Sequence, residues 1–276
     1  MTMKNDPPNQ AQAEMWNQDG GRTWADLHAT LDMVFQPLAT VLVDEVLATG
    51  GERVLDVGCG AGGATLAVAR ALRPNGQRTG IDISAPLIAT ANARATAEGA
   101  GDVTFIRGDA QTYAFNAGRF DTIISRLGVM FFDNPGAAFA GLRRATQPEA
   151  RLALIAWRAP DQNSFMVAAE RAAASIVKDF PVRNDDGPGQ FAFASASRVE
   201  GILQAGGWTS IDIRPVDLPC SFPATELPAY VTRMGPYGRI RETLDENMRA
   251  RALRAWRPGT LHKRMLAGEG PRLGTT

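Results

Sequence analysis

The sequence predicts an α/β fold in which a doubly wound, mostly parallel sheet carries helices on both faces. Short apolar runs alternate with longer amphipathic or alanine-rich segments from about residue 37 to residue 156. A glycine cluster directly follows the first apolar run, and an acidic residue closes the second at Asp82. The chain of 276 residues is 45% hydrophobic, which is enough to bury a substantial core.

The strands are expected where β-branched and apolar residues cluster between turn residues. Their predicted ranges are 53–57, 78–82, 103–107, 122–125, 151–156 and, less regularly, 208–218. The helices are expected where apolar residues recur at helical spacing, and Ser84 is a suitable N-cap for one of them. Their predicted ranges are 11–17, 23–32, 37–49, 63–72, 85–98, 135–146, 163–179, 198–205 and 240–256.

These elements divide the chain into three parts. Residues 1–36 are expected to form an N-terminal tail and a helical lid, and residues 37–218 a Rossmann-like ligand-binding domain. Residues 219–276 form a C-terminal extension with a substrate cover, a helix and an irregular tail. The stretch 258–276 is rich in glycine and proline, so we expect it to form no buried strand. The strand at 208–218 is then an exposed edge or is covered by a partner, which predicts a possible homodimer.

Charge and cysteine content exclude several classes of protein. Lys plus Arg and Asp plus Glu both total 29, which argues against a general nucleic-acid surface. The two cysteines, Cys59 and Cys220, suggest a reducing cytoplasm rather than a disulfide framework, and no Cys/His cluster suggests a metal. No signal peptide or membrane span is expected from the apolar pattern.

The glycine cluster fits two classes of ligand. Gly58, Gly60 and Gly63 satisfy the spacing of dinucleotide sites, whereas Gly58, Gly60 and Gly62 satisfy that of S-adenosylmethionine (SAM) sites. Asp56 favours the second class, because a carboxylate repels a pyrophosphate but attracts an ammonium and a sulfonium. The helix that begins next adds free N–H groups and a partial positive charge.

Further motifs follow the glycine cluster in order. The segment Asp56-Val57-Gly58-Cys59-Gly60-Ala61-Gly62 resembles the first motif of class I SAM-dependent methyltransferases. Gly80-Ile81-Asp82-Ile83-Ser84, Gly108-Asp109-Ala110 and Phe120-Asp121-Thr122-Ile123-Ile124-Ser125-Arg126 match later motifs. The resemblance covers roughly residues 10–217 and is greatest to the ubiquinone/menaquinone C-methyltransferase-like group of small-molecule enzymes.

The resemblance implies a role for each matching residue. Asp82 would accept the ribose hydroxyls and Asp109 the adenine amino group, while the backbone at Gly58 to Gly60 lines the methionine end. The full set of cofactor-binding residues implied is Asp56, Gly58, Cys59, Gly60, Gly62, Asp82, Ile83, Gly108, Asp109, Ala110, Ser125 and Arg126. Arg126 and His28 are weak candidates for catalysis, and no metal is expected.

The function predicted is methyl transfer from SAM to a small acceptor. Apolar and aromatic residues are frequent in the segments 160–193 and 220–238, which are expected, with the N-terminal helices, to determine the substrate, and this favours a hydrophobic or aromatic acceptor. Two alternatives stay open: a non-catalytic module that binds SAM or a nucleotide, and an NAD(P)-dependent oxidoreductase.

Overall fold

The chain forms two compact units. A computed structural model describes residues 7–72, 76–163, 187–221, 225–234 and 244–255, together with a few single residues between 167 and 177 and residue 238. The first unit comprises Met1–Trp157 and Asp185–Arg214, and the second comprises Arg158–Asn184 and Pro215–Thr276. The division of the chain at residues 36 and 218 stays a prediction about which segments fold together.

The first unit contains a parallel sheet of five strands in the order β3-β2-β1-β4-β5. The strands are β1 (Arg53–Val57), β2 (Gln77–Asp82), β3 (Val103–Arg107), β4 (Phe120–Arg126) and β5 (Thr146–Ile155). The strand order reverses between β1 and β4, and a crevice outside the carboxyl ends of the strands is the usual ligand site there. The prediction of a Rossmann-like sheet is therefore confirmed.

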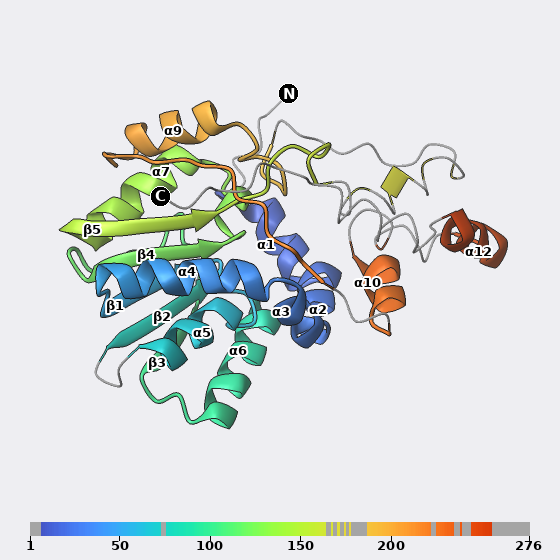
Figure 1. Ribbon diagram of the computed structural model, residues 1–276, viewed down its shortest axis with the longest axis horizontal. Helices are drawn as coiled ribbons and strands as arrows, with labels where there is room; N and C mark the ends of the chain where they lie inside the picture. Colours follow the sequence, from blue (N-terminus) through green and yellow to red (C-terminus); the bar gives the residue numbers. More distant parts are fainter. Residues whose placement is uncertain are drawn as a thin grey trace, which may run out of the picture. The chain divides into compact units, whose positions relative to one another are not determined.

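Helices cover both faces of this sheet (Figure 1). Helices α4 (Gln36–Thr49) and α5 (Gly63–Ala71) pack on the face that carries Val54 and Ile124. On the other face, α7 (Pro135–Ala145) and α9 (Ala196–Ala205) pack against Leu55 and Ile123. The two faces alternate along each strand because successive side chains point in opposite directions. Helix α6 (Ala85–Glu98) lies beside β2 and β3, with Ser84 as its N-cap as expected.

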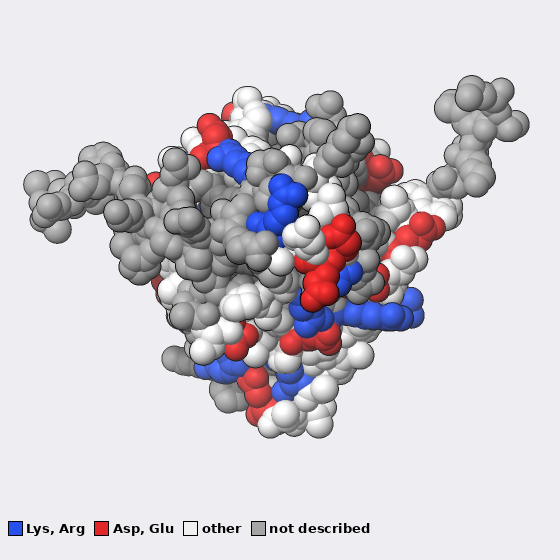
Figure 2. All heavy atoms as spheres, turned by 90° about the vertical axis from the view of Figure 1, so that its right-hand side faces the viewer, with Lys and Arg blue, Asp and Glu red and all other residues white. Residues whose placement is uncertain are grey.

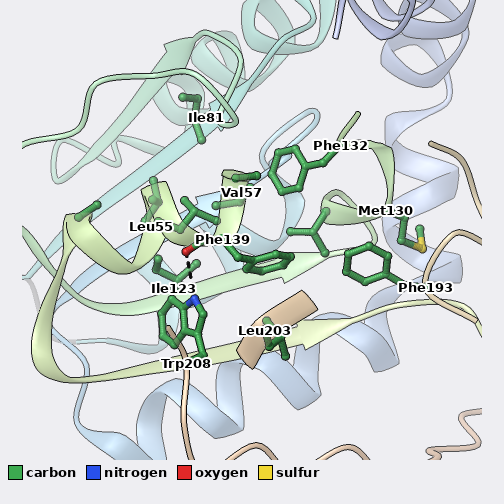
Figure 3. Packing of buried hydrophobic residues seen from close by; sticks show 14 of the residues in the cluster. Leu55, Val57, Ile81, Ile123, Met130, Phe132, Phe139, Phe193, Leu203 and Trp208 are labelled. Atoms are coloured by element: carbon green, nitrogen blue, oxygen red, sulfur yellow. Dashed lines mark hydrogen bonds between the residues drawn. The ribbon is translucent and has the colours of Figure 1, made fainter. Parts of the chain in front are cut away.

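The core beneath α7 is aromatic (Figure 3). Phe139 is fully buried and lies edge-on to Phe132, with ring centroids 6.0 Å apart. The indole N–H of Trp208 donates to the Phe139 carbonyl oxygen over 3.1 Å. This bond fixes the chain that follows α9 against the core.

The prediction of a sixth strand at 208–218 is wrong, because the structure has no strand between residues 208 and 221. Ser210 has a φ of 54°, which interrupts an extended conformation, and Ile213 and Val216 are 40% and 50% exposed. The apolar residues of the segment 208–218 therefore alternate in the sequence without packing on a buried surface. In the described part of the chain, β5 pairs with β4 alone. The tail at 258–276 lies outside the described residues.

The N-terminal segment folds as α1 (Gln10–Asn17), α2 (Asp19–Asp26) and α3 (His28–Val34), which we call the lid helices. The helix expected at 23–32 begins earlier, at Asp19, and is divided into α2 and α3, so the residues Asp19-Gly20-Gly21 lie in a helix and not in the expected gap between helices. A Cβ at Gly21 would collide with the Trp16 carbonyl oxygen, so this glycine allows α1 and α2 to approach closely. These glycines therefore permit close packing of two helices and do not form a loop.

Some later boundaries also differ from expectation. Helix α9 begins at Ala196, two residues before the expected start at 198, and is capped by Ser195, while α10 (Leu227–Arg233) was not among the expected helices. Helix α12 (Glu246–Ala255) falls within the helix expected at 240–256. Most of the helix expected at 163–179 lies outside the described residues.

Candidate functional site

The glycine loop after β1 has a backbone that side chains would disrupt. Gly58, Gly60 and Gly62 have φ values of 67°, 55° and 81°. A Cβ at Gly58 would lie 2.6 Å from the Cα of Gly128, so the loop passes close to the segment that follows β4. The amides of Gly58 and Cys59 both donate to the Ile81 carbonyl oxygen, over 2.9 and 3.1 Å. These amides therefore hold the loop to β2 instead of pointing at a ligand.

Asp56 is a buried acid with one unsatisfied oxygen. Its side chain is 1% exposed, and the Thr65 hydroxyl donates to Oδ2 over 2.6 Å. Oδ1 has no hydrogen-bond partner among the described residues. Burial raises the pKa of Asp56 to about 6, and the Thr65 bond and the nearby Arg126 only partly oppose this. A cationic ligand would satisfy this oxygen, as expected of a site for SAM.

Asp82 supports the glycine loop from the end of β2. Its Oδ2 accepts from the Gly60 amide over 2.8 Å, and its Oδ1 accepts from the Ser84 amide over 2.9 Å. Burial raises the pKa of this carboxyl, and the backbone bonds oppose the rise. Asp82 is thus fixed at the carboxyl edge of the sheet, where a ribose would need its acceptor.

Two adjoining cavities lie between the sheet edge and the lid helices. The larger holds about 700 Å³ of space free of protein atoms, its open mouth included, and the smaller about 480 Å³. Both are lined by Gly58, Gly60 and Arg126, so they meet at the glycine loop. The larger also takes lining from Asp82, Ile83, Gly108, Asp109 and Ala110, and the smaller from His28, Asp56 and Cys59. Ten of the twelve cofactor-binding residues implied by the motifs thus line one cavity or the other.

The other two implied residues, Ser125 and Gly62, support the site from behind. The Ser125 hydroxyl donates to the Val57 carbonyl oxygen over 2.7 Å and accepts from the Gly128 amide over 3.2 Å. Ser125 therefore joins the ends of β1 and β4. Gly62 is the N-cap of α5, and a Cβ there would lie 2.7 Å from the Phe105 ring.

Asp109 is bonded to the lid. Its Oδ1 accepts from the Asn9 side-chain amide over 3.1 Å and from the Gln111 backbone amide over 2.9 Å. Asn9 Oδ1 in turn accepts from the Asp133 amide over 2.9 Å. Asn9 was missed by sequence reasoning, because no local motif marks a residue whose partners lie 100 and 124 positions away.

A second contact joins the lid to the smaller cavity. Asp32 on α3 accepts from Arg126 over 3.1 Å and from Arg94 on α6 over 2.6 Å. Arg94 also donates to the Ala61 carbonyl oxygen of the glycine loop over 2.6 Å. No sequence motif marks Asp32 or Arg94. Arg126 lies at the cavity as expected, and its guanidinium forms an ion pair with Asp32.

His28 lines the smaller cavity. Its Nδ1 lies 2.8 Å from the Ala25 carbonyl oxygen. A carbonyl oxygen can only accept, so we assign the proton to Nδ1, which leaves Nε2 of the neutral ring as an acceptor.

Aromatic rings form the apolar wall of the two cavities. Trp16 lies edge-on to Trp24 and to Phe131, with ring centroids 5.7 and 5.2 Å apart. Trp24 stacks on Phe35 at 6.4 Å. These rings bring large apolar surfaces to the site while leaving polar recognition to a few side chains.

Comparison with known proteins agrees with this geometry. Residues 54–149 match the family described as Methyltransferase domain. This match agrees with the predicted resemblance to class I SAM-dependent methyltransferases. The family resemblance and the choice of SAM as cofactor are thereby confirmed.

Individual relatives point the same way. Over 120 residues the chain is 35% identical to nocamycin O-methyltransferase of Saccharothrix syringae, covering 44% of this chain and 43% of that protein. It is also 32% identical over 110 residues to demethylmenaquinone methyltransferase of Lactiplantibacillus plantarum, and this match covers 40% of this chain and 46% of that protein. The matched segments span less than half the length of these relatives. The YcgJ protein from Bacillus subtilis has the same fold, with a TM-score of 0.53 at 18% identity over 82% of this chain and 86% of that one.

Proposed function

We propose that this chain transfers the methyl group of SAM to a small hydrophobic or aromatic acceptor. The observation that carries this proposal is the unpartnered Asp56 carboxylate oxygen on the wall of a cavity that continues to Asp82 and Asp109. When bound, SAM supplies a methyl group already activated by a sulfonium. The protein then has to align the two reactants and exclude water.

Each part of the cofactor has a matching group on the protein. Asp82 would accept the ribose hydroxyls, and Asp56 would face the ammonium end beside Gly58. The adenine would lie in the larger cavity between Ile83 and the Gly108 to Ala110 turn. The smaller cavity, lined by His28, Leu31 and Phe35, would receive the acceptor next to the glycine loop.

His28 is the group best placed to take a proton from the acceptor, because its Nε2 is free to accept. The variant H28N keeps a side-chain amide that can donate to the Ala25 carbonyl oxygen but removes the base. For an acceptor that must lose a proton, we expect kcat to fall about a hundredfold while the Kd for S-adenosylhomocysteine stays the same. An unchanged kcat would remove His28 from the chemistry.

Calorimetry with S-adenosylhomocysteine, NAD and NADP tests the proposed function. We expect S-adenosylhomocysteine to bind and both dinucleotides to fail. Binding of NAD or NADP instead would establish an oxidoreductase. Incubation with labelled SAM and a metabolite extract then distinguishes an enzyme from a non-catalytic binding module, because only an enzyme labels a product. Label found solely in small, highly charged metabolites would argue against a hydrophobic acceptor.

The setting of the reaction is also part of the proposal. Both cysteines are free thiols, which supports a cytoplasmic location. Lys and Arg are interspersed with Asp and Glu among the described residues on the face shown in Figure 2, which supports a small-molecule rather than a nucleic-acid substrate. Within the described segments, no helix has both the length and the apolar character that crossing a membrane requires. The homodimer was expected from an edge strand at 208–218, which is absent, so a homodimer remains a prediction with no surface assigned to it, which light scattering can check.

A further inference from the structure

Arg126 lies at the end of β4, and the hydrogen-bonding capacity of its guanidinium group is only partly used. Its Nη2 donates to Asp32 over 3.1 Å, which is its only hydrogen bond to a residue that the structure describes. Nε and Nη1 have no such partner and, unlike Asp56 Oδ1, are not fully enclosed by the described residues. Because the side chain lines both cavities, these N–H groups can donate to a bound molecule.

The contacts of this guanidinium place it on the side of the smaller cavity. Asp32, its ion-pair partner, and Phe35, the ring beside it, line the smaller cavity but not the larger one. The central guanidinium carbon lies 6.0 Å from the centroid of the Phe35 ring, and Trp24 stacks on the same ring at 6.4 Å. A planar cation therefore lies beside an aromatic wall, at the position proposed for the acceptor.

The charges around the smaller cavity also favour an anionic acceptor. The charged side chains that line it are Asp32, Asp56 and Arg126, and Arg94 pairs with Asp32 over 2.6 Å. Two carboxylates and two guanidinium groups leave this part of the site with no net charge. SAM brings a sulfonium, an ammonium and a carboxylate, and so adds a net positive charge. An acceptor with one negative group would neutralise the loaded site, and it would find its cation in Arg126.

We propose that Arg126 selects an aromatic acceptor that carries a carboxylate, which accepts hydrogen bonds from Nε and Nη1 while the ring of the acceptor lies against Trp24 and Phe35. Arg126 is thereby assigned to the acceptor and not, as its motif implies, to the cofactor. Asp32 is then a positioning residue, which fixes the guanidinium through Nη2. This inference rests on the proposed function, because it names the class of acceptor that the SAM-loaded site takes.

The test compares two probes of the same shape, 2-naphthoate and 2-naphthamide, of which only the first is charged. Calorimetry measures their Kd for protein saturated with sinefungin, a SAM analogue that carries a positively charged amino group in place of the sulfonium methyl. We expect the wild-type chain to prefer naphthoate by about tenfold or more, as charge-assisted hydrogen bonds should give. In R126M, which keeps an apolar stem beside Phe35, the preference should fall to about twofold or less. R126Q loses the charge but stays polar, and we expect the same result.

Two controls separate this role from others. R119M makes the same change at the opposite end of β4, where the exposed Arg119 lies over the Phe120 ring at 5.4 Å, and it should keep the wild-type preference. The second control asks whether Arg126 holds the carboxylate of the cofactor instead. It compares S-adenosylhomocysteine with its decarboxylated analogue, and we expect R126M to change the two affinities to the same degree. Since each preference is a ratio measured within one variant, a general loosening of the site cancels.

The outcomes separate the inference from the proposed function. A wild-type chain that binds neither sinefungin nor S-adenosylhomocysteine would overturn the proposed function and the inference with it. A wild-type chain that binds sinefungin but shows no preference for naphthoate, or binds neither probe, would overturn the inference alone. So would a full preference in R126M or R126Q. If R126M weakens S-adenosylhomocysteine about tenfold more than its decarboxylated analogue, Arg126 belongs to the cofactor and the inference is also overturned.

Discussion

The two sides of the cavity are built in different ways. On the sheet side, Asp56 and Asp82 lie at the carboxyl ends of β1 and β2. Thr65, near the start of the next helix, donates to Asp56, and the backbone amides of Gly60 and Ser84 donate to Asp82. On the lid side, Asn9 and Asp32 bond to residues between 62 and 124 positions away, mostly through side chains. The two acids on the sheet side are therefore held by partners within 22 positions in the sequence, whereas the two lid residues are held by distant ones.

This difference predicts a difference in function. Groups on the sheet side are held in place before a ligand arrives, so each change there should remove binding energy directly. Contacts on the lid side hold a movable surface against the sheet, so changes there should alter affinity by smaller amounts. The following substitutions test this comparison in order of expected effect.

Asp82→Ala should have the largest effect. It removes the charged acceptor proposed for the ribose and also the partner of the Gly60 amide. We expect binding of S-adenosylhomocysteine to weaken by roughly 2–4 kcal/mol, measured by calorimetry, while the fold survives. D121A is a matched control, because Asp121 also accepts two backbone amides, from Glu52 and Arg53, but at the start of β4. If both variants bind like the wild type, the ribose is held elsewhere.

Asp56→Asn should separate stability from binding. The folded pKa of about 6 lies above the ordinary aspartate pKa of 3.8, so between these values the folded chain binds more protons than the unfolded chain. The free energy of unfolding therefore falls as pH rises from about 4 to 6, and this loss persists at higher pH. The variant lacks this loss, so at pH 7.5 it should be more stable than the wild type by about 1–3 kcal/mol.

The gap in stability should close near pH 4, which denaturant unfolding at both pH values can measure. The same variant should bind S-adenosylhomocysteine poorly at every pH, because the ammonium group loses its counter-charge. In the wild type, affinity should weaken as pH falls through about 6 and Asp56 becomes protonated. Equal free energies of unfolding of the two chains at pH 7.5 would show that ionising the buried Asp56 does not destabilise the fold.

Asp32→Asn should have the smallest effect. It weakens the contacts of the lid with Arg94 and Arg126, whose side chains are 19% and 14% exposed. We expect the affinity for S-adenosylhomocysteine to fall by about 1 kcal/mol, as for a partly buried ion pair. E98Q is the control, because it breaks the more exposed pair of Glu98 with Arg70. Equal effects of the two variants would mean that Asp32 has no special part in closing the site.

The same comparison explains what the sequence could predict. The five strands, the glycine loop, Asp82 and the Gly108-Asp109-Ala110 turn follow local patterns, and the structure contains each of them, although β5 begins at Thr146, five residues before the expected start at 151. Asn9, Gln12, Asp32 and Arg94 carry no such pattern, because their roles depend on which helix packs over which strand end. The missing strand at 208–218 is a related failure, since apolar alternation alone does not show whether a sheet edge is available to pair with it.

Hydrogen exchange with and without S-adenosylhomocysteine tests most directly whether both sides form one site. The structure predicts that the ligand slows amide exchange in the glycine loop, residues 58–63, and also in α1, residues 10–17, because Asn9 and Gln12 close over the same cavity. A ligand that protects both segments would support a site shared by the sheet edge and the lid. Protection of the glycine loop alone, with unchanged exchange throughout α1, would contradict this account.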